Sequence, residues 1–157
     1  EKKKMKASRG QQMISMTMRS SRVTTSPVMT TCFRLKRSYS VQTMTVNQYS
    51  KILNSNARGK YQIVDVREPD ELNSFNVQDN DIMNLPISQS WKWGTDIARH
   101  QHPLDPVKPV ICVCRSGRRS MTFATFLSTV GFETVYNLYG GMDEYAHVID
   151  PTVRKGL

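Results

Sequence analysis

One thiol and three guanidinium groups lie within the short segment from Cys114 to Ser120, and their chemistries are complementary. The segment reads Cys114, Arg115, Ser116, Gly117, Arg118, Arg119 and Ser120. The thiolate is the nucleophilic form of cysteine, and neighbouring positive charge favours it. Arginine keeps its charge, and its planar fork suits the oxygens of an oxyanion. The segment therefore predicts a reactive sulfur at position 114 with an anion clamp beside it.

The flanking residues predict how this segment is positioned. Residues 109–113 form a short apolar, β-branched run typical of a buried parallel strand, and a helical apolar pattern starts at Ser120. Cys114 then lies at the carboxyl end of a strand, where open α/β sheets bind ligands, and faces a helix N-terminus. If residues 115–119 curl around the sulfur, several unpaired backbone N–H groups point at it, with Gly117 allowing the turn. We expect Cys114 to be substantially ionised at neutral pH.

A structural alternative stands beside this interpretation. Free cysteines are among the most buried residues, so Cys114 can also be a core cysteine followed by a solvated, arginine-rich turn. The immediate succession of arginines and glycine at the change from strand to helix favours the functional interpretation.

Strand-like and helix-like segments alternate through most of the chain. Strands are expected at residues 61–67, 82–87, 109–113 and 134–139, and helices at residues 45–53, near Asp70, at 88–99, at 120–130 and after Gly140 and Gly141. This alternation predicts an α/β fold, with a central, mostly parallel sheet and helices on both faces. No internal repeat is visible, so one such unit is expected.

Two stretches carry a family resemblance. Residues 110–145, VICVCRSGRRSMTFATFLSTVGFETVYNLYGGMDEY, closely resemble the active-site half of rhodanese domains, and Ile63 to Glu68 resembles their DVRE element. The similarity spans roughly residues 41–150, and the carboxyl tail is most similar to single-domain rhodaneses of cyanobacteria and plastids. It implies the rhodanese-like fold and a sulfurtransferase that carries a sulfane sulfur as a persulfide on Cys114. The implied partners are a small donor such as thiosulfate and an acceptor that is cyanide, a thiol or a protein thiol.

The length of the loop separates two chemistries that share this architecture. The related phosphatases and arsenate reductases use Cys-x5-Arg, whereas Arg119 here completes Cys-x4-Arg and position 120 is serine. The shorter loop favours a sulfur atom over a phosphoryl group. A Cys-based phosphatase or arsenate reductase therefore remains the enzymatic alternative. A persulfide carrier or binding module without turnover is the other.

Asp65 and Arg67 end the predicted strand at residues 61–67, and two interpretations are open. Because the ends of parallel strands converge, Asp65 can bond the arginine-rich loop and hold its shape, with both residues contributing to substrate binding. Alternatively, the charged pair is solvated or forms a salt bridge with a neighbour.

The net charge of +9 belongs to the amino-terminal part of the chain. Residues 1–40 hold ten of the 22 Lys and Arg residues and a single acid, Glu1, whereas basic and acidic residues balance from residue 41 onward. A leader rich in Arg, Ser and Thr with so little acid is typical of organellar transit peptides, which predicts a mitochondrial or plastid destination. A disordered basic tail is the alternative. Residues 41–157 are expected to form the rhodanese domain.

Several partners are not expected. The only cluster of basic residues in the predicted folded part is the cysteine segment, so nucleic-acid binding is not expected. No apolar stretch is long enough for a membrane span. The cysteine and histidine spacing matches no zinc site, so neither a metal nor a cofactor is expected. Cys112 shares a strand face with Cys114 and is expected to pack in the core, with a resolving thiol as the alternative.

Overall fold

The computed structural model describes residues 40–74 and 81–153, so the predicted leader lies almost entirely outside the described residues. The strands are β1 (Val41–Met44), β2 (Gln62–Asp65), β3 (Ile82–Asn84), β4 (Val110–Val113) and β5 (Val135–Leu138), and the helices are α1 (Val46–Leu53), α2 (Pro69–Ser74), α3 (Ser90–Ala98), α4 (Arg118–Thr129) and α5 (Gly141–Val148). Short 3₁₀ turns occupy Arg58–Lys60, Ile87–Gln89 and Pro151–Val153. In this described part, no helix has the length and apolar character needed to cross a bilayer.

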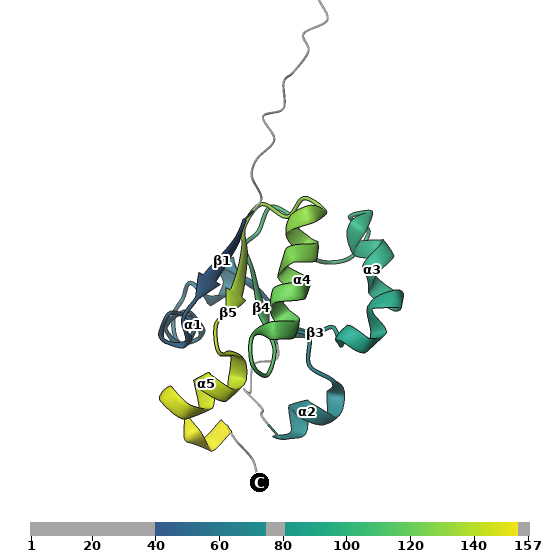
Figure 1. The fold of residues 1–157 in the computed structure, drawn as a ribbon. Helices are drawn as coiled ribbons and strands as arrows, with labels where there is room; N and C mark the ends of the chain where they lie inside the picture. The colour runs from purple at the N-terminus through teal and green to yellow at the C-terminus, as the bar shows by residue number, and fades with distance from the viewer. Residues whose placement is uncertain (1–39, 75–80, 154–157) are drawn as a thin grey trace, which may run out of the picture. The chain divides into compact units, whose positions relative to one another are not determined.

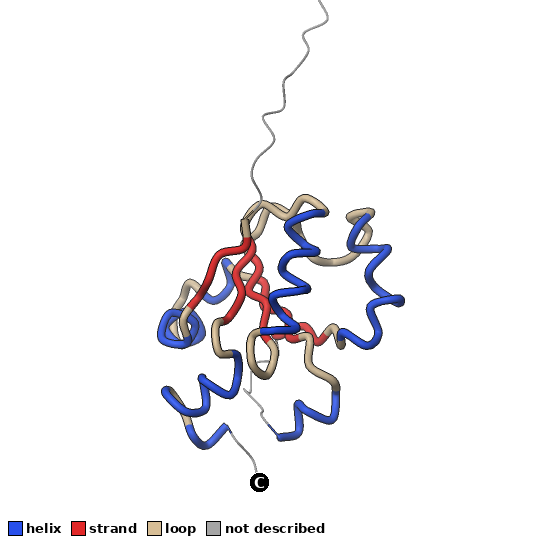
Figure 2. Tube along the Cα trace, in the orientation of Figure 1, coloured by secondary structure: helices blue, strands red, loops and turns tan. Residues whose placement is uncertain are grey.

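The strands form one parallel sheet in the order β1-β5-β4-β2-β3. Helices α1 and α5 cover one face, and α3 and α4 cover the other (Figure 1). The tube view shows the same three layers, with the strands between the two groups of helices (Figure 2). Strand β4 is central, so the residue after it lies at the middle of the sheet's carboxyl edge, which is the ligand-binding edge of such folds. The predicted fold class is confirmed.

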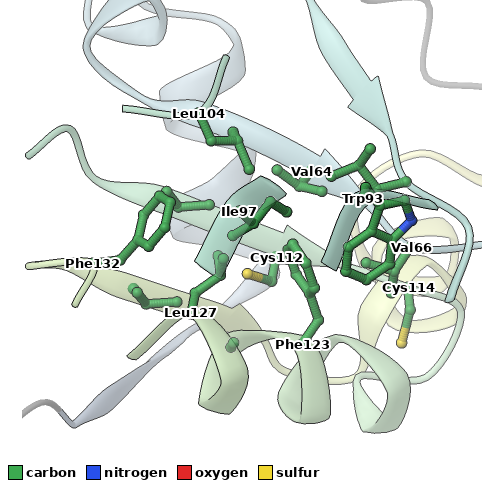
Figure 3. Close-up of a cluster of buried hydrophobic side chains, with 14 residues drawn as sticks. Val64, Val66, Trp93, Ile97, Leu104, Cys112, Cys114, Phe123, Leu127 and Phe132 are labelled. Carbon is green, nitrogen blue, oxygen red and sulfur yellow. The ribbon is translucent and has the colours of Figure 1, made fainter. Parts of the chain in front are cut away.

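Alternation along the central strands divides the core in two. Ile111 and Val113 face α1 and α5, whereas Val110 and Cys112 face α3 and α4. Burial on both faces is why β4 reads as an unbroken apolar run. Figure 3 shows the second cluster, in which the Cys112 sulfur lies among core side chains and Cys114 sits at the cluster's end with its sulfur pointing away.

Most of the expected elements are found within a residue or two of their predicted bounds. Helix α1 begins with the predicted capping box, in which the Thr45 hydroxyl accepts from the Gln48 amide and the Gln48 side chain accepts from the Thr45 amide. Two differences matter for the site. Helix α4 begins at Arg118 and not at Ser120, and the edge strand β1 was not predicted.

Candidate active site

Cys114 occupies the turn between the central strand β4 and helix α4. Gly117 is the N-cap of α4 and has a φ of +86°, in the left-handed region that favours glycine. The first turn of α4 holds no acidic residue, and no side chain caps it. Arginines at the first two positions oppose the helix dipole. The two arginines therefore destabilise this end of α4 and make it suitable for binding an anion.

The sulfur of Cys114 has two polar partners in the described part of the chain. The Gly117 N–H and the Ser120 hydroxyl each lie 3.2 Å from Sγ and can donate to it. Cys114 is fully buried, which agrees with one part of the structural alternative. The two polar partners of the sulfur disagree with that alternative, because an ordinary core cysteine has apolar neighbours. The expectation of several converging backbone amides is corrected to one amide and one hydroxyl.

The N-terminus of α5 holds the cysteine turn from outside. The amide of Met142 donates to the carbonyl of Cys114 and that of Asp143 to the carbonyl of Arg115, both at 2.9 Å. Gly141 makes this approach possible, because its φ is +60° and a Cβ at this position would collide with both carbonyl oxygens. With these carbonyls bound to α5, the turn is free to direct the Gly117 amide toward the sulfur.

A buried hydrogen-bond chain connects the sulfur to strand β5. Ser120 Oγ lies 2.7 Å from Asn137 Oδ1, and Asn137 Nδ2 donates to the Gly117 carbonyl at 3.1 Å. Ser120 and Asn137 are both buried, so each bond is sheltered from water. The Ser120 hydroxyl has a single proton, so the thiolate and Asn137 compete for it. This chain fixes both the hydroxyl and the glycine beside the sulfur.

The three arginines have different surroundings. Arg119 forms a bidentate ion pair with Glu71 of α2, with both N–O distances at 2.6 Å. Arg115 and Asp143 lie 3.3 Å apart, and the Arg115 side chain is 57% exposed. Arg118 is exposed and has no acidic partner among the described residues. The hydrogen bond from Arg119 is the main cause that lowers the pKa of Glu71 to about 2. The same hydrogen bond to Glu71 is the main cause that raises the pKa of Arg119, with a smaller contribution from Cys114.

Asp65 and Arg67 pair with each other. Arg67 Nε donates to Asp65 Oδ2 at 2.8 Å, and the Arg67 amide donates to Asp65 Oδ1 at 3.0 Å. Both residues are buried. This is the salt-bridge alternative, since the Asp65 carboxylate bonds Arg67 and not the cysteine turn.

Comparisons with known proteins agree with this geometry. The model of the rhodanese-like domain matches residues 46–147. The chain belongs to the rhodanese-like family. A chloroplastic rhodanese-like/PpiC domain-containing protein 12 of Arabidopsis thaliana is 35% identical over 59% of this chain and 29% of its own length. Rhodanese-like domain-containing protein 17 of the same plant is 32% identical over 64% of this chain and 65% of its own length. The chain thus spans less than two thirds of either plant relative.

A solved structure extends this family relationship to sulfur chemistry. The polysulfide-sulfur transferase of Wolinella succinogenes superposes with a TM-score of 0.54, is 27% identical, and the match covers 68% of this chain and 74% of that one. The rhodanese-like family therefore includes relatives named for sulfur transfer.

Cys112 behaves as a core residue of the rhodanese-like domain. It is fully buried on the α3 and α4 face, and this burial, with a smaller effect of Cys114, raises the pKa of its thiol well above the ordinary value. Neither cysteine forms a disulfide. Core packing, the expected role, is what the structure shows for Cys112.

Sequence reasoning missed three contributors to the rhodanese-like site, namely Asn137, Glu71 and Gly141. Asn137 could have been found from the sequence, because a polar side chain within an apolar strand needs a buried partner. Gly141 could also have been found, because it is the second glycine before a helix. Nothing in the sequence indicated Glu71, since its partner lies 48 residues away.

Proposed function

We propose that this protein is a sulfurtransferase that moves a sulfane sulfur from a donor such as thiosulfate to cyanide or a thiol through a persulfide on Cys114. The observation that carries the proposal is the pair of groups that can donate to Sγ where helix α4 begins, the Gly117 amide and the Ser120 hydroxyl. Hydrogen bonds to an ionised acceptor are stronger than those to a neutral one, so this arrangement stabilises a charged sulfur.

The reaction follows in two balanced steps. The Cys114 thiolate attacks the outer sulfur of thiosulfate, the S–S bond of the donor breaks, and its electron pair leaves with sulfite. The charged persulfide then gives its outer sulfur to a thiolate or to cyanide, which restores the Cys114 thiolate and releases a persulfide or thiocyanate. Covalent catalysis of this kind produces ping-pong kinetics.

Position 120 supports sulfur transfer over phosphate hydrolysis. A phosphatase of the same architecture needs its phosphate-binding arginine there, whereas this chain has Ser120, with its hydroxyl 3.2 Å from Sγ. The preceding arginine, Arg119, is already paired with Glu71. Parallel assays with thiosulfate plus cyanide and with p-nitrophenyl phosphate separate the two activities.

Mass measurement after incubation with thiosulfate tests the mechanism. We expect the protein to gain one sulfur atom and the Cys114→Ser variant to gain none while keeping its thermal unfolding midpoint. The matched control is Cys112→Ala, which removes the other thiol of the domain and should still take up sulfur. Uptake by Cys114→Ser would rule the mechanism out. Stable uptake without turnover for any acceptor would favour a persulfide carrier.

The leader supports an organellar location, mitochondrion or plastid. Residues 1–40 have the composition of a transit peptide, and one plant relative is named chloroplastic. Import of a reporter fused to residues 1–40 tests this location. Retention of the reporter outside both organelles would contradict it.

A further inference from the structure

The carboxylate of Glu71 binds the Arg119 guanidinium in the way that an oxyanion substrate would bind it. Its two carboxylate oxygens accept from two guanidinium nitrogens at 2.6 Å, which is the bidentate geometry that arginine also offers to other oxyanions. Glu71 is itself held in place, because its Oε2 accepts from the amide of Glu68 at 3.0 Å. The arginine closest in sequence to Ser120 is therefore neutralised by a carboxylate of the same chain.

The other two arginines leave little positive charge focused on the sulfur. The Arg115 ion pair is long and mostly exposed, and Arg118 is exposed to solvent, so water and salt screen both charges. Thiosulfate carries two negative charges, so its binding depends strongly on positive charge near the sulfur. An alkyl persulfide carries at most one negative charge, at its sulfur, so its binding depends less on that positive charge.

We propose that Glu71 is a specificity-determining residue, which by occupying Arg119 disfavours dianionic donors and makes alkyl persulfides the preferred sulfur donors of Cys114. This inference rests on the proposed function and names the substrate class. The transfer is balanced: the Cys114 thiolate attacks the outer sulfur of R–S–SH, the donor's S–S bond breaks, and its electron pair and the proton leave as R–SH.

The outer side of the cysteine turn offers apolar surface to an organic donor. An open pocket of about 400 Å³ is lined by Ser116, Gly117 and Arg118 of the turn and by the exposed side chains of Met121 and Tyr139, which contribute apolar surface. The carbon skeleton of an alkyl persulfide can contact this surface, whereas thiosulfate has no apolar part.

Donor selectivity of the full chain tests the inference. The kcat/KM for sulfur uptake is measured with thiosulfate and with β-mercaptoethanol persulfide for the parent, Glu71→Gln and Asp70→Asn. Asp70 is the matched control, because it is exposed in the same turn of α2 and its replacement removes the same charge without touching Arg119. We expect the parent to prefer the persulfide. The ratio of thiosulfate to persulfide kcat/KM should rise about fivefold in Glu71→Gln, the scale of a partly exposed ion pair, and stay unchanged in Asp70→Asn.

Inhibition by inorganic sulfate provides a second measurement that needs no thiosulfate turnover. Sulfate should inhibit uptake from the persulfide more strongly in Glu71→Gln than in the parent. An unchanged donor ratio in a folded Glu71→Gln variant, or an equal rise in Asp70→Asn, overturns the role of Glu71. A parent that prefers thiosulfate overturns the substrate class. If the parent takes up sulfur from neither thiosulfate nor the persulfide, the proposed function itself is overturned.

Discussion

At the scale of single residues, Ser120 is the group whose role is most open to test. Its hydroxyl lies 3.2 Å from Sγ, and removing it leaves the sulfur with the Gly117 amide as its remaining donor among the described residues. A hydrogen bond to a charged group contributes about 1.5–3 kcal/mol, so Ser120→Ala should slow sulfur uptake by about tenfold or more. The measurement is the rate of persulfide formation under single-turnover conditions.

Ser128 is the matched control, since it is a second buried serine of α4 without a contact to Cys114. Ser128→Ala should keep the parent's uptake rate. Equal losses in the two variants would mean that the helix, and not the hydroxyl, determines the rate.

The residues of the site differ in how far the sequence could predict them. Cys114 and Gly117 were predictable because the properties that matter, a thiol and a left-handed turn before a helix, are local. The contacts of Asn137 and Glu71 are not local, since they join residues 17 to 48 positions apart. Asp65 lies at a strand end as predicted, but its carboxylate pairs with Arg67, two residues away, and not with the cysteine turn.

At the scale of elements, the turn after β4 depends on the start of α5. Gly141 has a positive φ and leaves no room for a Cβ beside the carbonyls of Cys114 and Arg115. Gly141→Ala should therefore lower the free energy of unfolding by about 2 kcal/mol or more. Gly94→Ala is the control, because Gly94 lies inside α3 with open space around it and should gain up to about 1 kcal/mol.

Urea unfolding monitored by circular dichroism measures both variants. The matched pair separates the positive φ and the close approach from the general effect of a glycine replacement. A Gly141→Ala variant as stable as the parent would show that α5 does not constrain the cysteine turn.

At the scale of the whole molecule, the apolar pattern of the sequence predicted the central strands and the helical layers, but it did not predict the edge strand β1. Strands β4 and β5 are identifiable because both of their faces are covered. Strand β1 has four residues, of which only Met44 is buried, and its sequence VQTM carries no strand-like alternation of apolar and polar residues. Its existence follows from pairing with β5, which is a tertiary contact.

This pairing predicts where the chain can be shortened. A variant that begins at Ser40 keeps β1 and should unfold cooperatively with the parent's stability. A variant that begins at Thr45 loses the ladder to β5, the bond from the Tyr139 amide to the Met44 carbonyl and the buried Met44 side chain. Burial of one such side chain is worth about 1.5–3 kcal/mol, so the second variant should lose at least about 2 kcal/mol in urea unfolding. It should also self-associate, because β5 becomes an unprotected edge. Equal stability of the two variants would show that β1 contributes nothing to the fold that positions Cys114.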